Sequence, residues 1–199
     1  NQHRCVYKNL RNIHQRKQRC KTGWEYGGYQ HIAPYYIIQI YYAQQAYDKV
    51  YDRAEELLAQ YPNNPHNDEL HRMLGEMYYQ DSAYLQAIEH LQAYNQLCKA
   101  DKREAQRNDL YLLGMANYKA ERYTDAINYL KMVKEQNDSI SESTYLHLGH
   151  SYLRVEDEEK AKLSYAATMR MNITSTIREE AMYNYVQITY LQGSALGES

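Results

Sequence analysis

Phenylalanine is absent from the 199-residue chain, proline occurs only three times, and no long run of apolar residues is present. A transmembrane helix needs about 20 consecutive apolar residues, so the sequence argues against a membrane-spanning segment. The scarcity of proline, beside abundant Ala, Leu, Gln, Glu and Lys, favours helix throughout. The chain starts at Asn1 without a signal-peptide pattern, and we expect it to be a piece of a longer protein.

Cysteine is also scarce. Cys5, Cys20 and Cys98 are an odd number and show no Cys-x-x-Cys spacing, which argues against a zinc site and against a disulfide framework. We expect buried or inert free thiols, with a Cys5–Cys20 bridge as the alternative.

Motifs of catalysis and cofactor binding are missing from the sequence. It contains no phosphate-binding loop, nucleophile elbow or nucleotide fingerprint. His147 and His150 are three residues apart, a spacing that suits metal ligands, but no third ligand is evident. The acids at 156–159 fit a turn and a helix start, where they favour the helix dipole. We therefore expect no enzymatic activity, no metal and no cofactor.

The formal net charge of −2 is unevenly distributed, because residues 1–24 carry seven Lys and Arg side chains and no acid. Such a segment can contact phosphate or an acidic partner. A solvated helix face or a capping element is the preferred interpretation. The remainder of the chain is acidic, which disfavours nucleic acid as a partner.

One sequence pattern recurs along the chain. The window LGEMYYQDSAYLQAIEHL at 74–91 shares seven positions with LGMANYKAERYTDAINYL at 113–130. The window that starts at 148 keeps the Leu-Gly pair, and the window that starts at 37 keeps three tyrosines. The four starts are 37, 39 and 35 residues apart, a period typical of stacked repeat proteins.

Apolar residues follow a helical period in each window, and short polar turns separate the helices. We expect antiparallel helix hairpins at 31–43 with 47–60, 67–80 with 84–97, 106–119 with 123–136 and 142–154 with 158–171, followed by a helix at 176–191. In three hairpins a Gly on the first helix and an Ala on the second predict close approach of the backbones. These pairs are Gly75 with Ala87, Gly114 with Ala126 and Gly149 with Ala161.

Leu-Gly-x-x-Tyr followed by Tyr-x-x-Ala-Ile, and in one unit by Tyr-Pro, resembles the tetratricopeptide repeat. The resemblance implies an all-α fold, a right-handed superhelix (α-solenoid) of antiparallel helix hairpins whose first helices line a concave groove. It covers units at about 31–64, 68–101, 107–140 and 142–175 and a terminal helix at 176–191. An atypical basic segment at 1–30 and a tail at 192–199 lie outside it.

Longer segments resemble narrower groups of repeat proteins. The stretches TYLHLGHSYLRVEDEEKAKLSYAAT and IREEAMYNYVQITY are similar to long repeat proteins of Bacteroidetes. The stretch YPNNPHNDELHRMLGEMYY is similar to repeats of periplasmic lipoproteins that coordinate outer-membrane assembly and division. The resemblance implies a location in the periplasm or cell envelope, with the cytoplasm as the alternative.

The resemblance to the repeat family also implies which residues line the groove. Tyrosine offers a large contact area at low entropic cost, together with a hydroxyl group. One variant of the family grips a C-terminal carboxylate with Lys and Asn, and these residues are missing from the corresponding positions. The alternative for Tyr42, Tyr79 and Tyr118 is packing between neighbouring units. The implied groove residues are Tyr35, Gln39, Tyr42, Arg72, Glu76, Tyr79, Tyr111, Met115, Tyr118, Leu146, His150, Tyr183 and Gln187.

These observations favour a non-catalytic protein–protein interaction module that binds a peptide or protein segment, with no small-molecule substrate. The alternative is a structural spacer or a self-associating scaffold without a groove ligand, which leaves a homo-oligomer open. Nucleic-acid binding through residues 4–21 ranks third.

Overall fold

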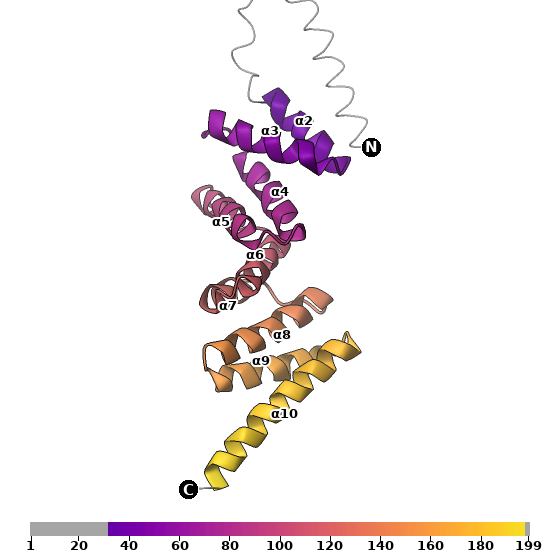
Figure 1. Ribbon diagram of the computed structural model, residues 1–199, viewed down its shortest axis with the longest axis vertical. Helices are drawn as coiled ribbons and strands as arrows, with labels where there is room; N and C mark the ends of the chain where they lie inside the picture. The colour runs from indigo at the N-terminus through magenta and orange to yellow at the C-terminus, as the bar shows by residue number, and fades with distance from the viewer. Residues whose placement is uncertain (1–31, 198–199) are drawn as a thin grey trace, which may run out of the picture. The chain divides into compact units, whose positions relative to one another are not determined.

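The computed structural model describes residues 32–197, with side chains described as far as residue 193. Every regular element in this range is an α-helix (Figure 1), which confirms the all-α prediction there. The basic segment 1–30, with Cys5 and Cys20, lies outside the described residues. The helices are α2 Ile32–Ala43, α3 Tyr47–Gln60, α4 Asn67–Gln80, α5 Tyr84–Ala100, α6 Arg107–Lys119, α7 Tyr123–Leu130, α8 Ser139–Arg154, α9 Glu158–Met171 and α10 Ser175–Gly197.

The helices pack in chain order. Helix α2 contacts α3, and from α5 onward each helix contacts the next one along the chain. The first helices of successive hairpins also touch, since α6 contacts α8 and α8 contacts α10. This sequential packing is consistent with the expected α-solenoid. The chain divides into two compact units, with the boundary between Leu70 and His71 inside α4.

None of the described helices combines the length and the apolar character needed to cross a bilayer.

The turn inside each hairpin has one backbone conformation. Gln45, Ser82, Glu121 and Glu156 all have φ between 58° and 61°. In the second of these turns Ala83 donates its N–H to the Tyr78 carbonyl, five residues back, at 2.9 Å. This Schellman pattern satisfies the last carbonyl groups of a helix. The four turn residues are 37, 39 and 35 positions apart, so the turn geometry repeats with the sequence.

Three glycines let the helices of a hairpin approach closely, as predicted. A Cβ atom on Gly75 would lie 2.6 Å from Leu91 Cγ, and one on Gly149 would lie 2.5 Å from the Tyr165 ring. The nearest side chain therefore belongs to a large residue and not to the expected Ala87. Leu91 lies one helical turn after Ala87, on the same face of α5. Gly114 has the same relation to Leu130.

The core lies between successive hairpins. One buried cluster combines Ile88 and Leu91 of α5 with Leu113 of α6, and the next combines Met115 of α6 with Leu148 of α8. Neighbouring hairpins therefore share their apolar cores, as in repeat proteins generally. The Cys98 thiol is buried and free, as expected.

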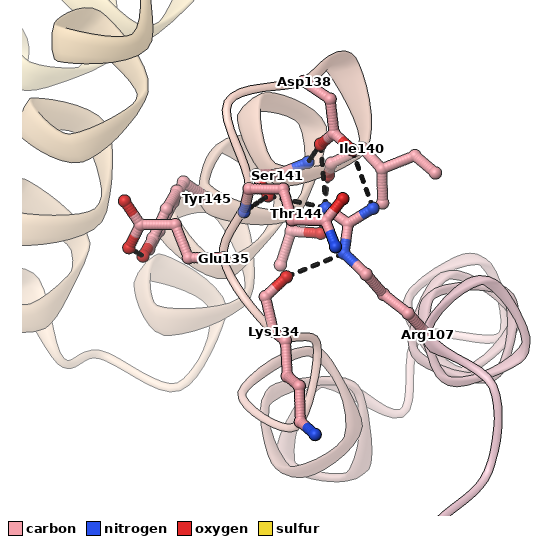
Figure 2. A network of polar contacts seen from close by, with 9 residues as sticks. Arg107, Lys134, Glu135, Asp138, Ile140, Ser141, Thr144 and Tyr145 are labelled. Carbon is pink, nitrogen blue, oxygen red and sulfur yellow. Dashed lines mark hydrogen bonds and ion pairs between the residues drawn. The ribbon is translucent and has the colours of Figure 1, made fainter.

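Residues at one repeat position join successive first helices. Arg107, at the start of α6, donates to both carboxylate oxygens of Asp138, each at 2.8 Å (Figure 2). Glu142, which is 35 residues later and fully buried, accepts from the N–H groups of Ile173 at 2.7 Å and Thr174 at 3.0 Å. The guanidinium of Arg107 thus pairs with a carboxylate at the start of α8. The carboxylate of Glu142 accepts from N–H groups at the start of α10.

Helices α7 and α10 differ most in length from the prediction, while α5 and α8 are each three residues longer than predicted. Helix α7 ends at Leu130 instead of 136, because Val133 bonds to the carbonyl three residues back and Arg107 binds the Lys134 carbonyl at 2.7 Å. Helix α10 continues past 191 to Gly197. Lys162 and Glu158 of α9 hold the Gln192 side chain, each at 2.8 Å, and so anchor this extension.

Candidate binding surface

Side chains of α6, α8 and α10 meet in one row. The Tyr111 hydroxyl lies 2.8 Å from Ser143 Oγ, and the Tyr118 hydroxyl lies 3.5 Å from His150 Nδ1. His150 Nε2 lies 3.4 Å from the Glu180 carboxylate. Each contact joins one first helix to the next. We call these five residues the inner strip.

A second histidine backs the inner strip. The His147 ring meets the Tyr118 ring edge to face at 4.9 Å, and its Nδ1 lies 2.7 Å from the Ser143 carbonyl oxygen. That distance identifies Nδ1 as the donor, because a carbonyl only accepts. The His147 and His150 rings meet edge to face at 5.8 Å. Among the described residues, no group of three or more His, Cys, Asp or Glu is arranged to hold a metal.

Burial sets the protonation of His147, His150 and Tyr118. It lowers the pKa of His147 and of His150 below the ordinary value of 6.5, and it raises the pKa of Tyr118 above 10. Both imidazoles are therefore neutral at pH 7, and the phenol keeps its proton. Glu180 supplies the carboxylate of a row whose other members are hydroxyl and imidazole groups.

Of the predicted residues of α4, Tyr79 packs in the same cluster as Tyr111 and Tyr118 of this row. Arg72 and Glu76 form a salt bridge of 3.6 Å along the helix. Tyr79 packs against the buried clusters of α5 to α8, and burial, with Tyr111 and Tyr84 nearby, raises its pKa to about 12. Tyr79 and Tyr118 are thus half-buried packing residues as well as neighbours of the row.

Two predicted groove residues of the second unit lie inside its core. Met115 and Leu146 are each only 4% exposed and belong to the buried clusters. Their positions face the neighbouring hairpin, so they present no surface to a ligand.

The predicted residues of α10 are the most accessible of the set. Tyr183 is 64% exposed, and Gln187 donates from Nε2 to the Tyr183 hydroxyl at 2.7 Å. This pair follows Glu180 on the same helix and extends the row of polar groups into solvent.

The first compact unit holds the remaining predicted residues. Tyr35 is 4% exposed and stacks flat on the His66 ring at 4.0 Å. Gln39 donates to the Tyr35 hydroxyl at 2.6 Å, and the Tyr42 ring lies 6.1 Å from that of Tyr47. Tyr35 therefore serves the core of this unit, while Gln39 and Tyr42 are half-buried.

Sequence reasoning missed two features of the second unit. His71 and His90 place their Nδ1 atoms 2.9 Å apart, a pairing with no signal in the sequence because the residues belong to different helices. A recess of about 320 Å³ is lined by Glu135, Asn137, Ala167, Arg170 and Met171. None of the predicted groove residues lines this recess.

Comparisons with known proteins add no family. No protein-family model matches the chain, and no curated protein matches it.

Proposed function

We propose that the chain is a non-catalytic protein-binding module of the tetratricopeptide-repeat type, and that the inner strip holds a peptide or protein segment of a partner. The repeat type is supported by the shared glycine position of α4, α6 and α8. It is further supported by left-handed turns that recur with the spacing of the sequence windows.

The observation that carries the binding proposal is the continuity of the inner strip. Tyr111 reaches Ser143, Tyr118 reaches His150, and His150 reaches Glu180. Polar side chains of α6, α8 and α10 therefore lie side by side. Hydroxyl and imidazole groups in such a row can pair with the N–H and C=O groups of an extended peptide, while the aromatic rings supply contact area.

The Glu180 carboxylate indicates which side chains the ligand should carry. Glu180 is about half exposed, with 51% of its side chain accessible, and the neighbouring imidazoles are neutral. A segment with a Lys or Arg at the α10 end of the strip complements this carboxylate. The exposed Tyr183 beside it can stack on a guanidinium group.

The test is a selection of a random peptide library, displayed on phage, against the full chain at about 1 μM. Selected peptides are then measured against a Glu180→Gln/Tyr183→Ala double variant, which changes one residue of the inner strip and the exposed tyrosine beside it. These side chains are exposed, so the variant keeps its fold. Leu163→Ala is the matched control, because Leu163 is 71% exposed on α9 and outside the strip.

The proposal expects at least about tenfold weaker binding in the double variant and unchanged binding in the control. Failure to select any peptide that depends on Glu180 and Tyr183 would overturn it. The chain would then fit a structural spacer, in which the inner strip only joins the hairpins.

We also propose that the chain works in the cell envelope, with the resemblance to exported repeat proteins as the support. Fractionation of the source cells, followed by immunodetection, tests this location. Recovery in the cytoplasmic fraction would contradict it.

A further inference from the structure

His150 of α8 contacts the helices before and after it through its two ring nitrogens. Its Nδ1 atom lies 3.5 Å from the Tyr118 hydroxyl of α6, and its Nε2 atom lies 3.4 Å from a Glu180 carboxylate oxygen of α10. A carboxylate only accepts, so it favours the neutral tautomer that carries its proton on Nε2. In that tautomer Nδ1 is the acceptor for the Tyr118 hydroxyl.

A second proton on the His150 ring would find a partner on each side. An imidazolium donates from both nitrogens. The Tyr118 oxygen can accept from Nδ1, because a phenol is both a donor and an acceptor. The Glu180 carboxylate would then face a full positive charge at 3.4 Å. Protonation thus converts the contact between α8 and α10 into an ion pair without moving either helix.

The surroundings of the ring oppose this proton but do not prevent it. Among the described residues, the titratable and charged groups that face His150 are Tyr118 of α6, His147 and Arg154 of α8, Tyr165 of α9 and Glu180 of α10. Desolvation, followed by the charge of Arg154, lowers the pKa of His150 below the ordinary value of 6.5. Both phenols keep their protons, because burial raises the pKa of each. Glu180 is therefore the one carboxyl group in this set that can pair with an imidazolium.

The proposed ligand needs the same carboxylate. The Glu180 side chain is 51% accessible, so a Lys or Arg of a bound segment can reach it beside His150. An imidazolium at His150 would compete for this carboxylate and would repel the incoming cation. The neutral ring does neither. The protonation state of His150 therefore decides whether Glu180 is available to a cationic ligand.

We propose that His150 makes the inner strip acid-sensitive: the strip binds a cationic peptide segment while the ring is neutral and releases the segment when the ring takes up a proton. This inference rests on the proposed function. Because the protonated chain binds more weakly, the affinity is highest above the pKa of His150 and falls as the pH drops through it. By the same linkage, a bound cation lowers the pKa of His150.

The probe is a peptide from the selection described above whose binding depends on Glu180 and on a Lys or Arg of its own. Calorimetry should show its dissociation constant rise about 3- to 10-fold between about pH 7.5 and about pH 5, the range in which a histidine titrates. The same peptide with its Lys or Arg replaced by Met is the control, and its affinity should change less than about twofold. Equal responses of the two peptides overturn the inference.

His150→Gln isolates the ring. Glutamine cannot titrate, so the ratio of the dissociation constants at the two pH values should fall to about 1, whatever the affinity near neutral pH. Glu180 is still present in this variant, so a titration of the carboxylate itself would leave the ratio high. His147→Gln is the matched control one turn earlier on α8, and it should keep the native ratio. A ratio that follows His147 instead of His150 overturns the inference.

NMR titration of the histidine rings in the full chain gives a reading that does not depend on the affinity of a variant. Saturating peptide should lower the pKa of His150, and an unchanged pKa overturns the inference. In the chain without peptide, Glu180→Gln should also lower it, because the variant removes the carboxylate that stabilises the imidazolium.

The two proposals fail in different ways. A chain that binds no such peptide near pH 7.5 overturns the proposed function and this inference with it. Binding that does not weaken in acid overturns the inference alone.

Discussion

Arg107 and Asp138 form a bidentate salt bridge, with both guanidinium–carboxylate contacts at 2.8 Å. Asp138 also accepts from the Ser141 N–H at 2.9 Å and so caps α8. One carboxylate therefore starts α8 and ties it to the first turn of α6. The planar guanidinium suits this double contact better than an ammonium group does.

Replacing Arg107 should weaken the junction between hairpins. Arg107→Met removes the contacts to Asp138, Ser141 and the Lys134 carbonyl. We expect the free energy of unfolding to fall by about 1–2 kcal/mol in urea titrations. Arg103→Met is the control, because the Arg103–Asp101 pair is largely exposed and should contribute less than about 0.5 kcal/mol. Equal losses in both variants would contradict a special role for Arg107.

The same pair predicts a dependence of stability on pH. Arg107 beside Asp138 lowers the pKa of that carboxyl from 3.8 to about 2. The unfolded state takes up this proton at a higher pH than the folded state, so the stabilisation is complete above pH ~4 and is lost as the pH falls toward 2. In urea titrations across this pH window, the free energy of unfolding should fall less in Asp138→Asn than in the native chain. The same pH dependence in both proteins would argue that Asp138 does not cause the loss of stability at low pH.

Glycine substitutions should separate close packing from helix propensity. Alanine favours a helix over glycine by about 1 kcal/mol. At Gly75 and Gly149, however, the new Cβ would collide with Leu91 or Tyr165, and we expect a net loss of about 1–3 kcal/mol.

Gly193→Ala is the matched control, since a Cβ atom at this position would have no neighbour within 4 Å. It should raise the thermal midpoint slightly. A stabilised Gly75→Ala chain would refute the close approach of α4 and α5.

Tyr165→Phe should stabilise the protein. The Tyr165 side chain is fully buried, and its hydroxyl has no hydrogen-bond partner among the described residues. A buried polar group without a hydrogen-bond partner destabilises the folded state by about 1–3 kcal/mol. Removing the hydroxyl should therefore raise the free energy of unfolding by about 1 kcal/mol. Chemical denaturation measures this directly. A destabilised variant would show that the hydroxyl finds a partner in solution.

Local features of the fold were predictable. Helix periods, polar turns and the Leu-Gly-x-x-Tyr pattern placed the hairpins, because these signals depend on residues within one or two turns of each other. The windows at 74 and 113 also predicted a repeated geometry, and the recurring left-handed residues Ser82 and Glu121 agree with that spacing.

The candidate site was less predictable, because burial depends on the neighbouring hairpin. Met115 and Leu146 occupy groove positions of the pattern, yet they face the adjoining core. The contacts of Tyr118 with His147 and His150 connect different helices, and no spacing along the chain encodes them.

The sequence by itself determined the order and pairing of helices, since hydrophobic period and turn chemistry are local properties. Tertiary structure alone decided that Leu91 fills the space beside Gly75, that Glu142 holds the start of α10, and that Val186 remains exposed. Each of these outcomes depends on how one helix is positioned against another, and packing between helices is set by side chains far apart in the chain.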